Sequence, residues 1–178
     1  MTLPYTSECA APVNAAAAAV FDYADDPARF GSHMQDRSWR MGGGRMDFEL
    51  DQSLGQAVGS VIRLSGRIFG LRLFLEASIV ERSPPHRKVW ETVSEPRLLV
   101  IGRYRMGFEV TAIGDAALLR VFINYALPVH GVGRVLGSLL GRYYAQWCVQ
   151  RMLNDTLRHF QSAGVATQKE SCCVTRTS

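Results

Sequence analysis

The stretch PVHGVGRVLGSLLG, residues 128–141, decides which of two very different folds the chain can adopt. Gly131, Gly133 and Gly137 follow a run that predicts a β-strand, as in the glycine-rich turn of a dinucleotide-binding unit. That turn requires the spacing G-x-G-x-x-G and a later strand with an acidic residue about 20 residues on. Here the spacing is one residue too long, and a long helical segment follows instead of a strand. The stretch therefore argues against nucleotide binding.

The same glycines form one stripe of a predicted helix over about residues 132–162. Gly133, Gly137, Gly141 and Ala145 recur every four residues. Each glycine inside a helix costs about 1 kcal/mol relative to alanine, so three of them need a compensating gain. The absent side chains either let another backbone approach closely or leave room for a ligand beside the helix. We favour close packing, and both can occur along one helix.

The middle of the chain predicts an antiparallel sheet. Apolar and polar residues alternate in runs joined by short turns, as expected of half-buried strands. These runs cover about residues 45–51, 60–67, 71–82, 87–93, 103–110 and 119–127. An opening strand over 5–10, a helix over 13–23 and a short second helix to Phe30 precede them. The fold class is therefore α+β, with about seven strands and a long C-terminal helix over their apolar face.

Composition limits the class of protein. The 178 residues include 47% hydrophobic and 20% charged ones, typical of a globular chain, and we expect one domain over 5–162. A disordered tail is expected over 163–178. The net charge of +4 is scattered without a basic block, which argues against nucleic acid. No signal peptide or transmembrane segment is evident, and the four cysteines form no disulfide or zinc pattern, so we expect a cytoplasmic protein.

Three segments resemble one known superfamily. They are APVNAAAAAVFDYADDPARF at 11–30, IVERSPPHRKVWETV at 79–93 and YAQWCVQRMLNDTLRHF at 144–160. Over about residues 5–162 the chain resembles the START-like (SRPBCC, birch-pollen-allergen) superfamily, and most of all its bacterial polyketide cyclase/dehydrase and lipid transport proteins. The resemblance implies a helix-grip fold, in which a curved antiparallel sheet wraps around the long C-terminal helix. It also implies a cavity between them for an apolar molecule, and it carries over no catalytic residue.

Motifs of known chemistry are missing. No nucleophile elbow, HExxH, P-loop or EF-hand pattern occurs, so we expect no metal and no cofactor. Glu91 is the weak catalytic candidate, because alternation along residues 88–93 allows two arrangements. Either Lys88, Trp90 and Thr92 face inward, or Glu91 does so between two valines. An inward Glu91 would have a raised pKa and possible acid/base competence, but we favour inward Trp90 because an unpaired buried acid is costly.

The candidate ligand-binding residues are apolar or amphipathic side chains on the predicted inward faces. They are Trp90, Tyr104, Met106, Phe108, Tyr125, Leu140, Tyr143, Tyr144 and Trp147. The leading hypothesis is a carrier or sensor of a lipid, polyketide, quinone or sterol-like molecule. An aromatase/cyclase-like enzyme acting on a polyketide is one alternative, so enzyme activity stays undecided. Coenzyme-Q-type lipid handling at a membrane surface is another, with transient membrane contact and an exposed apolar patch at the cavity mouth. The chain is expected to be a monomer or homodimer.

Overall fold

The computed structural model describes residues 2–30, 46–68, 71–129 and 131–164, and within them one sheet carries the fold. Its strands are β1 (Tyr5–Val13), β2 (Met46–Leu50), β3 (Val61–Ile68), β4 (Leu71–Ser83), β5 (Arg87–Thr92), β6 (Tyr104–Ile113) and β7 (Ala116–Tyr125). Their order is β1-β7-β6-β5-β4-β3-β2, and every neighbouring pair is antiparallel. The predicted α+β fold class is confirmed.

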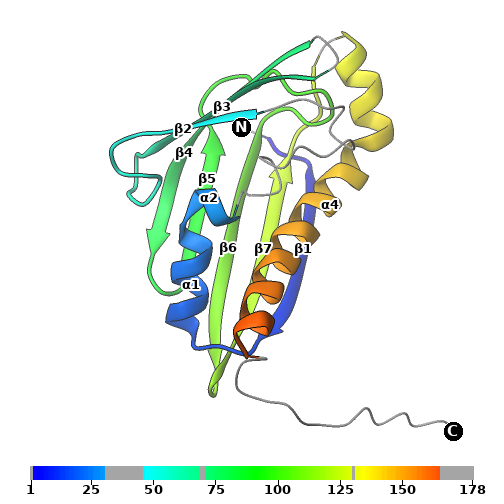
Figure 1. The fold of residues 1–178 in the computed structure, drawn as a ribbon. Helices are drawn as coiled ribbons and strands as arrows, with labels where there is room; N and C mark the ends of the chain where they lie inside the picture. The colour runs from blue at the N-terminus through cyan, green and yellow to red at the C-terminus, as the bar shows by residue number, and fades with distance from the viewer. Residues whose placement is uncertain (1, 31–45, 69–70, 130, 165–178) are drawn as a thin grey trace, which may run out of the picture.

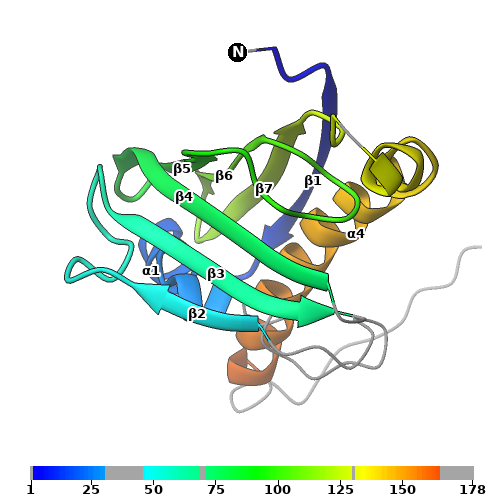
Figure 2. The same ribbon diagram turned by 90° about the horizontal axis from the view of Figure 1, so that it is seen from above.

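One long helix, α4 (Gly131–Gly164), runs diagonally across the sheet (Figures 1 and 2). It packs mainly on β1 and β7, and α1 (Ala17–Asp25) and α2 (Pro27–Phe30) cover the same face farther along. The face of β1 under α4 carries small side chains, including Ser7, Cys9 and Ala11. These let the helix approach the sheet closely. The helix-grip arrangement implied by the resemblance is therefore present.

The start of the first helix differs from the prediction. The sequence predicts a helix from about Val13, but β1 continues to Val13 and α1 begins at Ala17. Val13 pairs with Ala117 of β7, and its side chain is only 1% exposed. Burial in the sheet therefore outweighs the helix propensity of the alanine run that follows.

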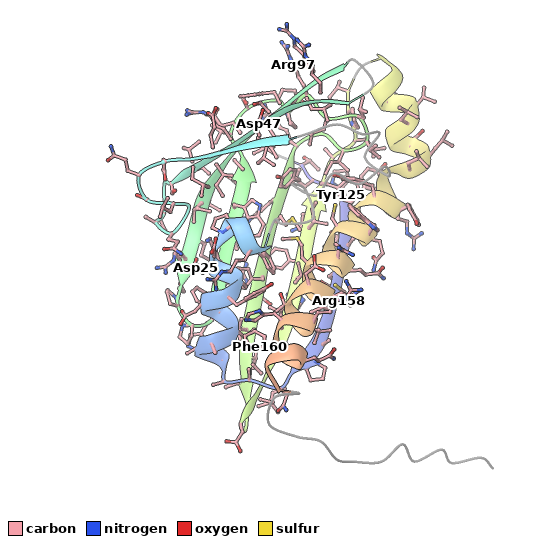
Figure 3. The ribbon with its side chains drawn as sticks, in the orientation of Figure 1. Asp25, Asp47, Arg97, Tyr125, Arg158 and Phe160 are labelled. Atoms are coloured by element: carbon pink, nitrogen blue, oxygen red, sulfur yellow. The ribbon has the colours of Figure 1, made fainter. Side chains whose placement is uncertain are left out.

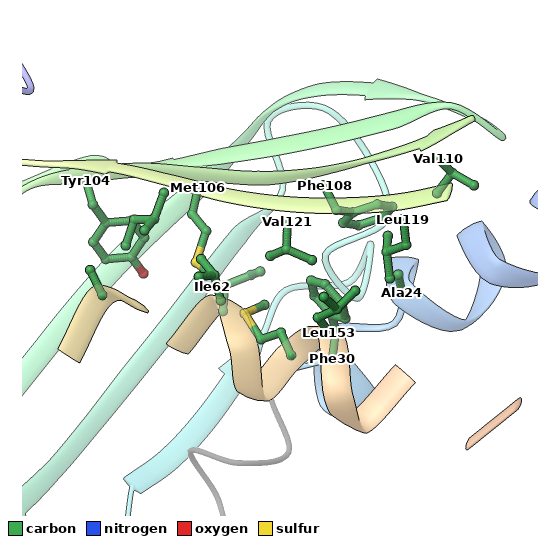
Figure 4. Close-up of a cluster of buried hydrophobic side chains, with 14 of the residues drawn as sticks. Ala24, Phe30, Ile62, Tyr104, Met106, Phe108, Val110, Leu119, Val121 and Leu153 are labelled. Carbon is green, nitrogen blue, oxygen red and sulfur yellow. The ribbon is translucent and has the colours of Figure 1, made fainter. Parts of the chain in front are cut away.

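The interior of the fold is apolar. Tyr104, Met106, Phe108 and Val110 of β6 face inward, as the alternation predicts (Figure 4). The inward face of β7 agrees as well, with Leu119, Val121, Ile123 and Tyr125 buried. In Figure 4 these strands lie above side chains of α4 such as Leu153, with Phe30 of α2 at the α1 end.

The glycine stripe of α4 packs closely, as we favoured. A Cβ atom on Gly137 would lie 2.8 Å from Cδ of Pro128 and 2.9 Å from the carbonyl oxygen of Val100. One on Gly141 would lie 2.9 Å from Cδ2 of Leu127. The segments before β6 and after β7 therefore occupy the space that larger side chains would need.

Some expectations fall outside the described residues. They include the part of the predicted tail beyond residue 164. The first two residues of that tail, 163 and 164, still belong to α4, so the predicted boundary at 162 is two residues too early. Among the described helices, none is both long and apolar enough to cross a membrane.

Candidate functional site

The interior between the sheet and α4 holds the candidate site. The alternation of β5 follows the arrangement that we favoured, because Lys88 and Thr92 are buried and Trp90 packs against the core. Glu91 points to the outer face, where its side chain is 43% exposed and its Oε2 lies 3.9 Å from Nη1 of Arg105. Glu91 is therefore unable to act on a molecule inside the fold.

A cluster of neutral polar groups lies among the apolar side chains between the sheet and α4. It consists of Trp90 from β5, Tyr104 from β6, and Tyr144 and Cys148 from α4. Burial and the nearby Cys148 raise the pKa of Tyr104, while a hydrogen bond from Trp90 lowers it. Cys148 raises the pKa of Tyr144 most strongly, followed by burial and their hydrogen bond. We call these four residues the interior polar cluster.

The thiol of the interior polar cluster keeps its proton at neutral pH. Burial raises the pKa of Cys148 to about 12, and its hydrogen bond with Tyr144 opposes that rise. Both hydroxyls and the thiol are therefore neutral at pH 7, since all three pKa values are raised. Such groups can donate and accept hydrogen bonds to a ligand, but they are poor bases.

The predicted wall residues of α4 fall on two different sides. Leu140, Tyr144 and Trp147 follow at helical spacing, and the rings of Tyr144 and Trp147 are 5.9 Å apart. Leu140 is 47% exposed and the two aromatic residues are half-buried, so this side leads from the solvent toward the interior. Tyr143 is 74% exposed and lies on the solvent side of the helix, apart from the others. We therefore leave Tyr143 out of the candidate site.

The predicted wall residues of β6 and β7 are spread along the core. Met106 follows Tyr104 along β6, while Phe108 packs with its ring 5.2 Å from Phe30 and 5.5 Å from Phe21 (Figure 4). Tyr125 lies under the first half of α4 and stacks on Tyr5 at 5.4 Å. Phe108 thus belongs to the packed end under α1 and α2.

A buried ion-pair group was missed from the sequence. Asp25 lies at the end of α1, where acidic residues are usually solvated, but its side chain is only 5% exposed (Figure 3). Nζ of Lys88 lies 2.7 Å from Oδ1 of Asp25 and donates a second hydrogen bond to the Asp25 carbonyl oxygen at 2.6 Å. Nη2 of Arg82 lies 2.8 Å from Oδ2. The sequence did hold one signal for this ion pair. The favoured arrangement of residues 88–93 turns Lys88 inward, and a buried lysine needs an acidic partner.

The charges of this group stabilise one another. Burial raises the pKa of Asp25. The hydrogen bonds from Arg82 and Lys88 and their positive charges lower it by more than burial raises it, so the pKa is below its usual value. Burial lowers the pKa of Lys88, and Asp25 opposes that shift. Each charge already has its partner, so the group is structural rather than a source of free acid or base.

A separate groove lies on the outer face of the sheet. Its volume is about 880 Å³, and it is lined by residues of β2, β3, β4 and the segment after β5. Its charged lining residues are Asp47, Arg67, Arg72, Glu95 and Arg97, of which Asp47 and Arg97 are labelled in Figure 3. Because both acidic and basic side chains line the groove, its charge does not select for an anionic or a cationic ligand. Among the described residues, no three His, Cys, Asp or Glu side chains are placed to hold a metal ion.

Comparison with known proteins identifies the fold. No family model and no curated protein sequence matches the chain. Solved structures do match, among them a protein from Thermus thermophilus with a TM-score of 0.61 and 13% identity over 89% of this chain and 99% of that one. Norcoclaurine synthase from Thalictrum flavum, in complex with dopamine and hydroxybenzaldehyde, matches with a TM-score of 0.60 and 10% identity over 93% and 89%.

A plant protein extends the comparison. Major latex-like protein 151 from Panax ginseng matches with a TM-score of 0.53 and 16% identity over 89% of this chain and 99% of that one. These neighbours include Bet v 1-like proteins of the START-like superfamily, and the chain has their helix-grip fold. One of these neighbours, norcoclaurine synthase, is an enzyme by name, but a shared fold alone leaves the activity of this chain open.

Proposed function

We propose that this chain, which has the helix-grip fold, binds an apolar small molecule between its sheet and α4, as a carrier or sensor. The observation that carries the proposal is the interior polar cluster, which places neutral hydrogen-bonding groups within an apolar wall. Ligand sites of this kind combine an apolar lining with a few polar groups that fix the orientation of the ligand. A lipid, polyketide, quinone or sterol-like molecule with one hydroxyl or carbonyl group fits that chemistry.

The state of the ionisable groups favours a carrier over an enzyme. Glu91 faces the solvent, and Lys88 and Asp25 neutralise each other. Cys148, with its pKa of about 12, stays protonated and is a weak nucleophile. These groups supply no free acid, base or thiolate, which supports binding of a molecule without chemical change.

An aromatase/cyclase-like enzyme is the second candidate, and one observation favours it. The buried hydroxyl of Tyr104 can donate a hydrogen bond to a ligand carbonyl, which would stabilise negative charge there during ring closure. The existence of an enzyme, norcoclaurine synthase, on the same fold keeps this candidate open.

Native mass spectrometry of the purified chain, followed by solvent extraction, tests the proposal. A bound lipid, quinone or similar molecule is expected, and we expect Tyr144→Phe to weaken its affinity by about five- to tenfold through the loss of one hydrogen bond. Glu91→Gln is the matched control, because Glu91 lies on the outer face, and it should leave the affinity unchanged. The proposal fails if the chain carries no molecule and neither long-chain lipids nor quinones bind to it in a direct titration.

A further inference from the structure

The first half of α4 exposes a stripe of apolar side chains. Val135, Leu139 and Tyr143 follow every four residues, so they lie on one side of the helix. Their exposed fractions are 61%, 73% and 74%. We call these three residues the outer stripe. The first turns of α4, drawn in yellow, lie at the outer edge of the molecule in Figures 1 and 2.

The outer stripe is held in this position by the opposite side of the same turns. There the glycine stripe packs on Pro128, Leu127 and the Val100 carbonyl, with no room for even one added Cβ on Gly137. Rotation of the helix to bury the outer stripe would bring larger side chains against that backbone. The exposure therefore follows from how α4 is anchored.

The charged residues in the first part of α4 have one sign. From Gly131 to Asn154, α4 has Arg134, Arg142 and Arg151 and no acidic residue. Arg134 and Arg142 are exposed beside the outer stripe, while Arg151 is farther along and pairs with Asp155. An apolar stripe with flanking arginines and no acid complements an anionic lipid surface.

A run of partly buried apolar side chains lies beside the outer stripe on α4. Leu140 is next to Leu139 in the chain and is 47% exposed, and Tyr144 and Trp147 follow it toward the interior polar cluster. Apolar side chains therefore run around α4 from the solvent to the candidate site. A bilayer that contacts the outer stripe would lie beside this run.

We propose that the outer stripe docks the protein on anionic lipid membranes. The apolar side chains insert between the lipids, and Arg134 and Arg142 bind the headgroups. Docking itself needs no bound ligand; only its purpose, exchange of an apolar molecule with the bilayer, rests on the function proposed above.

Co-sedimentation of the full chain with lipid vesicles tests the docking. We expect binding to vesicles of phosphatidylcholine with phosphatidylglycerol, and much weaker binding to phosphatidylcholine alone. The combined variant Val135→Ser/Leu139→Ser/Tyr143→Ser should lower the affinity at least tenfold, because it removes the inserted apolar area. Arg134→Gln/Arg142→Gln should lower it about 25-fold on the anionic vesicles, and salt should weaken wild-type binding.

A matched control uses exposed apolar residues elsewhere. Val58 and Ile113 are 62% and 54% exposed and lie outside α4, so Val58→Ser/Ile113→Ser should bind vesicles as the wild type does. Thermal unfolding of each variant shows that the fold is intact. Equal binding by the wild type and the triple serine variant, or no binding to the anionic vesicles, would overturn the proposal.

Two further outcomes separate the alternatives. A dimer that forms in light scattering and is lost in the triple variant, without vesicle binding, would assign the outer stripe to a second copy of the chain and overturn membrane docking. Native mass spectrometry of the same preparations measures the bound molecule independently. Vesicle binding without any bound molecule would support docking and count against the function proposed above. A bound molecule without vesicle binding would support that function and overturn docking.

Discussion

Nζ of Lys88 lies 2.7 Å from Oδ1 of Asp25, although the two residues are 63 positions apart in the chain. The contact joins β5 to the end of α1, and both side chains are at least 95% buried. The Lys88 ammonium also reaches the Asp25 carbonyl at the C-terminus of α1, where a positive charge is favourable. Together with Arg82, it fixes α1 on the sheet beside the apolar core.

Removal of one charge should therefore destabilise the fold strongly. Asp25→Ala leaves the Lys88 ammonium buried without its partner, and we expect it to lower the free energy of unfolding by about 3–5 kcal/mol. The double variant Asp25→Leu/Lys88→Met should recover most of that loss, because the fully buried ammonium is removed and the remaining Arg82 side chain, 28% exposed, can be solvated. Denaturant unfolding measures both. As a control, Glu91→Gln should change stability by less than about 0.5 kcal/mol, since its pair with Arg105 is exposed.

Acid should weaken the same interaction. The pKa of Asp25 lies below its usual value in the folded protein, so between the folded and unfolded pKa values the unfolded state binds more protons. The stability from the Asp25 carboxylate is therefore fully present above about pH 4 and is lost as the pH falls through the folded pKa. Unfolding measured from pH 7 to pH 3 should show a steeper loss for the wild type than for Asp25→Leu/Lys88→Met. Parallel curves would contradict this account.

The glycine stripe should tolerate no side chain at its centre. Gly137→Ala gains about 1 kcal/mol in helix propensity, yet its Cβ would overlap Pro128 and the Val100 carbonyl. We expect a net loss of about 1–3 kcal/mol in the free energy of unfolding. The neighbouring Ser138→Ala, on the exposed side, is the control and should be neutral or slightly stabilising. A stabilising Gly137→Ala would show that α4 does not approach these segments so closely.

Cys148 should react slowly with alkylating reagents. Its pKa of about 12 leaves little thiolate at pH 8, so iodoacetamide labelling should be about a thousandfold slower than for a free cysteine. Mass-spectrometric peptide mapping in the native and denatured protein measures the difference. Equal rates in the two states would show that Cys148 is not buried beside Tyr144.

The same shift should destabilise the fold in alkali. Folded Cys148 keeps its proton up to about pH 12, whereas the unfolded thiol loses it above about pH 9, so stability should fall as the pH rises past 9. Cys148→Ala removes the thiol and should flatten this decline. A decline of the same slope in Cys148→Ala would assign it to other groups such as Tyr104 and Tyr144.

The sequence by itself determined the class of fold and the facing of most strands. Strict alternation fixes which side of a half-buried strand is apolar, so Tyr104 to Val110 on β6 and the inward side of β7 could be assigned from local pattern alone. The four-residue spacing of the glycines likewise predicted close packing of α4, since a helix repeats its faces at that interval.

Only the tertiary structure decided how distant groups meet. The acids at the end of α1 are typical of a solvated helix end, and the local sequence does not show that Asp25 is buried. Its burial depends on β4 and β5, which bring Arg82 and Lys88 to the same point. The outer position of Tyr143 and the meeting of Trp90 with Tyr104 and Cys148 depend on how α4 is rotated against the sheet. Local propensity acts over a few residues, whereas burial and charge pairing depend on contacts between segments far apart in the chain.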